Sequence, residues 1–300
     1  YVVWGKIAGT PHRLVSPGRH DSLFFLPSYS CVLWAHRIVY DMCAQPSPHN
    51  WSRELYGRYG KTIRSHLSKV VLPNWRKSIP RASRNGITGK IKCLTECRKQ
   101  WNLHKHMIDW MERMFRFLER CYTKHHTLPS LREVGLESFR TCIYECIKCD
   151  IHDAMAVLVQ AEREMPSFDM DQSLIKSMME MIREIGPTPF AHVQELVKPF
   201  LQTTREYYAR RYRGWMEEEK STLGYLTKVK AVLQEESARV TKHHLDELTG
   251  NKVLQACAEA LLEKAMPVLV EWEGSGDGAQ KVETLLQIVL LTLSSSSKRA

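Results

Sequence analysis

From about residue 30 onward, the apolar residues of this chain recur at steps of three and four, and no stretch alternates apolar and polar residues. Steps of three and four place side chains on one face of an α-helix, whereas a half-buried strand needs alternation at steps of two. The pattern therefore predicts an all-α protein. A length of 300 residues predicts roughly two domains or one elongated array of repeats.

Prolines, glycines and polar runs divide this pattern into separate helices. The expected helices span residues 31–45, 51–71, 90–100, 103–124, 131–149, 151–165, 171–185, 191–219, 222–245 and 251–272. We expect Pro73 to end the second helix, residues 74–89 to form an exposed loop, and Pro199 to kink the helix over 191–219.

Two of these helices carry clear apolar stripes. The first stripe consists of Leu55, Tyr59, Ile63, Leu67 and Val70. The second consists of Met107, Trp110 or Met111, Met114, Leu118, and Cys121 or Tyr122. A stripe of Met and aromatic residues can be a binding surface, but packing is the first interpretation because a helix must bury one face.

The positive charge of the chain is concentrated in one segment. Residues 51–125 hold 18 Lys and Arg against five Asp and Glu, whereas the remainder holds 25 against 28. Such a segment can attract nucleic acid, an anionic membrane surface or an acidic protein. It can equally be a solvated helix surface that binds nothing, because net charge bears on association and not on fold.

The nine cysteines are odd in number and lack the regular pairing of a secreted disulfide scaffold, which favours reduced thiols. Cys142, Cys146 and Cys149 are candidate zinc ligands, but they lack the Cys-x-x-Cys knuckles of a structural zinc site. We expect them to be small buried residues on one helix face, like Cys93 and Cys97. The pair His243-His244 is expected to be solvated.

The sequence carries none of the common catalytic motifs: no phosphate-binding glycine loop, G-x-S-x-G elbow, HExxH or EF-hand pattern. We therefore predict no catalysis, cofactor or metal. No secretory signal is recognisable at the beginning of the chain. The longest apolar run, over 285–293, is shorter than the roughly 20 residues of a membrane-spanning helix, so a soluble protein is expected.

Four stretches resemble the cullin family. The segment WNLHKHMIDWMERMFRFLERCYTKHHTLPSLREVGLESFR, residues 101–140, resembles the family pattern W-x-x-H-K-x-M followed by P-L-x-x-V-G-L-x-x-F-R. Upstream, IVYDMCAQPSPHNWSRELYGRYGKTIRSHL resembles plant-type cullins of the subgroup that carries F-box receptors. Downstream, FLQTTREYYARRYRGWMEEE and GYLTKVKAVLQEESARV are similar to a second repeat, so that the resemblance covers about residues 34–272.

The resemblance implies a helical solenoid of five-helix cullin repeats, in which neighbouring helices bury one another. The first repeat would span 30–128, the second 129–248, and the start of a third 249–273. Residues 1–29 match nothing in the family and are expected to be poorly ordered. Residues 274–300 form a divergent tail in which GSGDG precedes an apolar and then a polar run.

For function, the resemblance implies a scaffold of a cullin-RING ubiquitin ligase and no enzyme. The expected partner is a Skp-type adaptor with an F-box protein, and the expected location is the cytoplasm and nucleus. The family's C-terminal domain, which holds the RING subunit, is not recognisable here, so no RING partner is expected. Membrane and nucleic-acid partners are likewise not expected.

The residues that would bind the adaptor follow from matching the family's second and fifth helices. The positions are Val32, Leu33, His36, Tyr40, Phe117 and Arg120. An aromatic side chain beside an arginine is typical of an interface hot spot. At Val32 and His36 the family usually has aromatic residues. Phe117 could instead belong to the core, and Tyr40 could cap the buried face of its helix.

A second hypothesis rests on the charged segment alone. It describes a basic helical-repeat protein that binds RNA or an anionic surface. The two hypotheses differ in what they require of Phe117 and Arg120, because only the adaptor scaffold depends on this particular pair.

Overall fold

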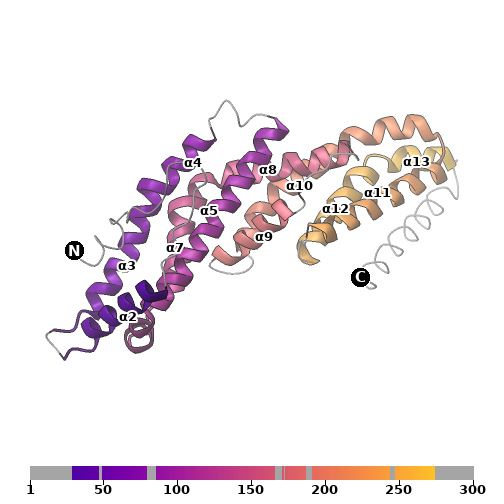
Figure 1. The fold of residues 1–300 in the computed structure, drawn as a ribbon. Coiled ribbons are helices and arrows are strands. Elements are labelled where there is room, and N and C mark those ends of the chain that lie inside the picture. The colour runs from indigo at the N-terminus through magenta and orange to yellow at the C-terminus, as the bar shows by residue number, and fades with distance from the viewer. Residues whose placement is uncertain are drawn as a thin grey trace. The chain divides into compact units, whose positions relative to one another are not determined.

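The computed structural model describes residues 29–46, 49–79, 86–165, 171, 173–186, 191–243 and 247–273. All regular structure in these ranges is helical, which confirms the all-α prediction (Figure 1). The expected N-terminal segment, apart from Tyr29, and the expected tail lie outside the described residues. No helix in the described ranges combines the length and the apolar character that crossing a membrane requires.

The chain separates into two compact units, each built from two segments that are distant in sequence. The first unit comprises residues 1–70 and 102–142, and the second comprises 71–101 and 143–300. The division into cullin repeats at residues 128 and 248 stays a prediction.

The first unit contains two helix pairs that position its surface. Helix α2 (Tyr29–Cys43) packs against the short helix α6 (Arg116–Leu118), and α3 (Ser52–His66) packs against α7 (Leu131–Phe139). The same unit contains the last part of α5 (Ile87–Met114) and the π-helical turn η3 (Glu119–Thr123). Figure 1 labels α2, α3, α5 and α7 of this unit.

The predicted stripe of α3 is largely confirmed. Leu55, Tyr59, Ile63 and Leu67 are buried, but Val70 is 45% exposed. Val70 lies in the π-helical turn η1 (Leu67–Val71), which inserts an extra residue per turn and so rotates it away from the stripe.

Pro73 does not end the helix, contrary to prediction. Helix α4 (Leu72–Ser78) follows η1 directly and holds Pro73 in its first turn. A proline is tolerated there because the first amide groups of a helix have no intrahelical acceptor. Residues 74–78 are accordingly helical and not part of a loop.

Helix α5 is continuous over Ile87–Met114, so the break expected near residue 102 is absent. In its second half the buried residues are Trp101, His104, Ile108, Met111 and Met114, followed by Phe115 and Leu118, so Met111, Met114 and Leu118 of the predicted stripe are confirmed. Met107, Trp110 and Tyr122 are only half-buried and Cys121 is exposed. The predicted stripe was therefore partly wrong, because counting apolar residues misses the buried histidine.

The second unit is centred on helix α10 (Ala191–Glu219), whose predicted bounds are confirmed and which continues through Pro199. It packs against α8 (Glu145–Glu164), α9 (Ser173–Ile185), α11 (Thr222–Lys242) and α12 (Glu247–Leu262). A short helix α13 (Met266–Glu273) contacts α11. The turn η4 (Arg140–Tyr144) joins α7 to α8, and no break occurs at residue 150.

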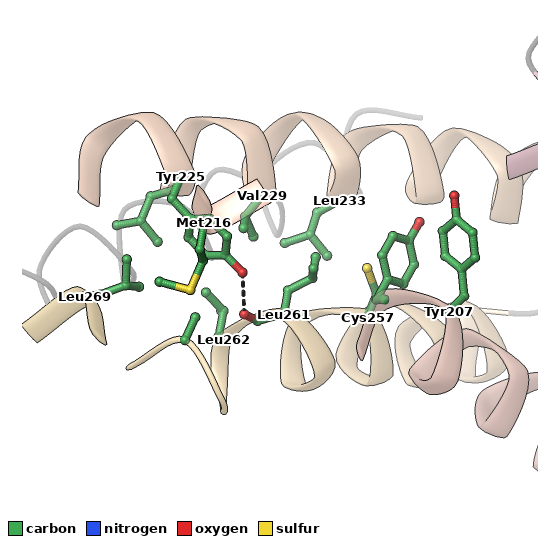
Figure 2. Close-up of a cluster of buried hydrophobic side chains, with 12 residues drawn as sticks. Tyr207, Met216, Tyr225, Val229, Leu233, Cys257, Leu261, Leu262 and Leu269 are labelled. Carbon is green, nitrogen blue, oxygen red and sulfur yellow. Dashed lines mark hydrogen bonds between the residues drawn. The ribbon is translucent and has the colours of Figure 1, made fainter. Parts of the chain in front are cut away.

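Helices α10 to α13 enclose a hydrophobic cluster (Figure 2). Tyr225 is fully buried in this cluster, and its hydroxyl donates a hydrogen bond to the carbonyl oxygen of Leu261 over 2.7 Å. Figure 2 shows Val229 and Leu233 following Tyr225 along α11, with Cys257 and Leu261 facing them from α12. Satisfying the buried hydroxyl removes the cost of placing a polar group in this core.

A buried ion pair crosses the same unit. The guanidinium of Arg163 contacts both carboxylate oxygens of Glu236, at 2.9 and 3.0 Å, and donates to Thr204 Oγ1 at 2.9 Å. Tyr208 Oη donates to Glu236 Oε1 at 2.6 Å. Burial alone would raise the pKa of Glu236, but the bonds from Arg163 and Tyr208 lower it below its usual range.

Two expectations about single side chains were wrong. Cys146 and Cys149 are exposed and Cys142 is half-buried, because Ile143, Ile147 and Ile151 occupy the buried side of that helix. His243 is buried, because its Nε2 pairs with Glu162 Oε2 at 2.8 Å. His244 lies outside the described residues.

Candidate functional site

Helix α2 presents an apolar surface to solvent. Its buried stripe consists of Val32, Ala35, Val39 and Cys43, at the spacing that seats an amphipathic helix. Leu33 and Tyr40 lie on the flank of this stripe and Trp34 on the opposite side, and the three are 53%, 45% and 51% exposed. Neighbouring large apolar side chains exposed in this way are typical of a surface that binds another macromolecule.

Helix α6 and turn η3 lie beside this surface. The ring of Phe117 meets the ring of Tyr40 edge to face, with centroids 4.7 Å apart and an interplanar angle of 71°. Phe117 is half-buried, and Arg120, which follows it by three residues, is exposed. We call Leu33, Trp34, His36, Tyr40, Phe117 and Arg120 the α2–α6 surface.

The predicted site residues differ in their accessibility. Leu33, Tyr40 and Arg120 are exposed, and His36 and Phe117 are half-buried. Val32 is only 6% exposed, since it belongs to the stripe that seats α2. The structure brings Tyr40 and Phe117 into contact, while the binding role of the six residues stays a prediction.

Trp34 was missed by sequence reasoning. The matched family positions do not include it. In the structure Trp34 follows the buried Val32 by two residues, a step of about 200° that places it on the opposite side of the helix.

Hydrogen bonds fix the ends of the elements that carry this surface. Asn50 Nδ2 donates to the carbonyl oxygen of Cys43 at 2.7 Å, and Asn50 Oδ1 accepts from the amide of Ser52 at 2.9 Å. One side chain therefore satisfies the end of α2 and the beginning of α3. Glu119 Oε2 accepts from the amide of Leu131 at 2.8 Å, which ties η3 to the start of α7.

The α2–α6 surface offers binding groups and no reactive centre. Its groups are aliphatic and aromatic side chains, one imidazole and one guanidinium, which suits a protein interface. Among the residues that the structure describes, no three His, Cys, Asp or Glu side chains gather in a way that could hold a metal ion.

Comparison with known proteins shows which family the chain resembles. A family model described as the cullin alpha solenoid domain matches residues 34–294. The chain is 31% identical to putative cullin-like protein 1 of Arabidopsis thaliana over 242 residues, which are 80% of this chain and 32% of that protein. It is 31% identical to cullin-1 of Oryza sativa subsp. japonica over 267 residues, 89% of this chain and 34% of the relative.

A shorter relative matches over most of its own length. Cullin-like protein 3 of Arabidopsis thaliana is 29% identical over 225 residues, which are 75% of this chain and 81% of the relative. In contrast, the chain spans only about a third of the two relatives named above. The family model covers well over half of the 300 residues. The chain therefore belongs to the cullin family.

Proposed function

We propose that the chain is a non-catalytic scaffold of a cullin-RING E3 ubiquitin ligase, acting in ubiquitin-dependent protein degradation. Membership of the cullin family supports this role. In this proposal a Skp-type adaptor carrying an F-box protein docks on the α2–α6 surface. The observation that carries the site is the contact between Tyr40 and Phe117, with Leu33 and Arg120 exposed beside it.

The physical basis is that of an interface hot spot. The ring of Phe117 is already held by Tyr40. Little side-chain entropy of Phe117 is therefore lost when a partner covers it. Arg120 can form paired hydrogen bonds to a carboxylate or to backbone carbonyls at the edge of the covered area. Val32 acts through the packing of α2 and not through contact with the partner.

The 300 residues alone should hold an adaptor without supporting ubiquitin transfer, since no RING-binding domain is recognisable in them. This is tested in a reconstituted reaction with adaptor, F-box protein, RING subunit, activating enzyme and conjugating enzyme. Inhibition of a reaction driven by a full-length cullin is expected. Restored transfer in place of that cullin would contradict it.

The docking site is tested by co-purification of the double variant Phe117→Ala/Arg120→Glu with a Skp-type adaptor. We expect it to retain little adaptor. The matched control is Lys69→Glu/Val70→Ala, which makes the same two kinds of change at exposed positions of the same unit. Adaptor at wild-type yield on the Phe117 variant would show that the site is wrong. Circular dichroism of both variants separates lost binding from lost folding.

A further inference from the structure

Four cationic side chains form a row that begins before the predicted site and ends beyond it. Arg113, Arg116, Arg120 and Lys124 follow one another at steps of three and four, and all four are exposed. Arg113 lies in the last turn of α5, Arg116 on α6 and Arg120 on η3, and Lys124 directly follows η3. The four therefore lie close together along the chain. Only Arg120 was predicted as a site residue.

These cations have no acidic partner among the described residues. Arg113 contacts the ring of Trp110, with Cζ 5.0 Å from its centroid, and no ion pair involves any of the four. The acidic residues of the same stretch bind groups of α7 instead. Asp109 Oδ1 and Glu112 Oε2 bind Arg132 at 2.9 and 3.5 Å, and Glu119 binds the Leu131 amide.

Because the acidic residues bind α7, the positive charge of the four cations stays uncompensated beside the contact of Phe117 with Tyr40. Three of the four cations are arginines, whose planar guanidinium pairs with carboxylates through two hydrogen bonds. Carboxylate and phosphate both satisfy that geometry. A phosphate backbone, however, does not cover the exposed aliphatic side chain of Leu33 on α2, whereas a protein partner covers apolar and charged groups together.

We propose that Arg113, Arg116 and Lys124, with Arg120, bind an acidic segment of the protein that docks on the α2–α6 surface. This inference rests on the proposed function for the identity of the partner. The row extends the interface beyond the Tyr40–Phe117 contact and steers the partner toward it. Rim charges of this kind act mainly on the association rate and give it a strong salt dependence.

The experiment measures association and dissociation rates of a Skp-type adaptor with the full chain at low and physiological ionic strength. The test variant is Arg113→Glu/Arg116→Glu, which leaves Phe117 and Arg120 in place. The control is Arg53→Glu/Lys61→Glu on α3, which changes the net charge equally at exposed positions of the same unit that form no ion pair with the described residues. A second probe is a fluorescent peptide of about twelve glutamates, compared with a single-stranded RNA of similar net charge.

We expect the test variant to associate about tenfold more slowly at low salt and the control less than threefold more slowly. Dissociation should change little in either. Equal slowing by both variants would overturn the row as a docking element, because only net charge would then matter. If the kinetics of the test variant are unchanged while Phe117→Ala/Arg120→Glu still loses binding, the row is rejected. The proposed docking site is then still supported.

The probes separate this inference from the proposed function. In one outcome, the wild-type chain fails to bind the adaptor and still binds the glutamate peptide, and this binding is lost in Arg113→Glu/Arg116→Glu. In that case the proposed partner is wrong and the acid-binding row is supported. If the RNA binds more tightly than the peptide and depends on the same arginines, the row is a phosphate-binding surface and the inference fails.

Discussion

His104 Nε2 donates a hydrogen bond to the carbonyl oxygen of Gly135 over 3.0 Å, inside the first unit. The imidazole also lies 4.9 Å from the ring of Phe139, centroid to centroid. Burial lowers the pKa of His104 to about 4, so the ring stays neutral near pH 7. The W-x-x-H-K and V-G-L motifs thus meet in the core, and in this chain they specify packing rather than docking.

Gly135 can accept no larger side chain without displacing its neighbour. A Cβ atom there would lie 2.8 Å from both Cγ1 and Cδ1 of Ile108. We expect Gly135→Ala to destabilise the protein by about 1–3 kcal/mol in urea unfolding. The matched control is Gly57→Ala, where a Cβ meets nothing within 4 Å. That change should stabilise by roughly 0.5–1 kcal/mol, and equal effects of the two would contradict the packing.

Removing one member of the Arg163–Glu236 pair should be costly, since both side chains are almost fully buried. We expect Glu236→Gln to lower the free energy of unfolding by about 3–5 kcal/mol, because Arg163 would keep a buried charge without its counterion. The exposed pair Arg205–Glu259, at 3.3 Å, is the comparison. Glu259→Gln should cost less than about 1 kcal/mol, and a similar loss for both would refute the burial argument.

The contact of Glu162 with His243 predicts a specific loss of stability in acid. The hydrogen bond from His243 and the neighbouring Lys242 lower the pKa of Glu162 to about 2, against an ordinary 4.5. A lowered carboxylate pKa stabilises the fold above pH 4.5, and this contribution is lost as pH falls toward 2.

In Glu162→Gln this share of the acid destabilisation should be absent. Urea midpoints measured between pH 5 and about 2 test this, with the exposed Glu164→Gln as the control. A wild-type slope in Glu162→Gln would show that the contact does not contribute.

Thiol reactivity should follow the burial of the described cysteines. Cys121, Cys146 and Cys149 are exposed, whereas Cys97 and Cys257 are buried, and burial raises the pKa of both of these thiols. We expect iodoacetamide to label the three exposed cysteines in the native protein and the two buried ones only after unfolding. Peptide mass spectrometry reads each site, and native labelling of Cys257 at the rate of Cys149 would contradict the fold.

Helix bounds could be predicted from the sequence where helix-breaking or capping residues flank the helix. The bounds of α10 were predicted because Gly186-Pro187 precedes it and Lys220-Ser221 follows it. Prediction failed where burial depends on a partner that is distant in sequence. His104 and His243 are polar, so periodicity places neither in the core, yet both are buried there, with Nε2 of His104 paired to the Gly135 carbonyl and Nε2 of His243 paired to the Glu162 carboxylate.

The candidate site could be predicted from the sequence only in part. Family resemblance pointed to Tyr40 and Phe117, and their contact could be seen only once α2 packed against α6. Trp34 and the row formed by Arg113 and Arg116 needed the folded chain, because exposure depends on which face each helix buries.

Amide hydrogen exchange with and without a purified Skp-type adaptor tests the central proposal most directly, because it maps contact over the whole chain without mutation. We expect slower exchange on adaptor binding within 29–46 and 113–124, and unchanged exchange in α12 and α13. Protection confined to other helices, or no protection at adaptor concentrations that saturate a full-length cullin, would contradict docking on the α2–α6 surface.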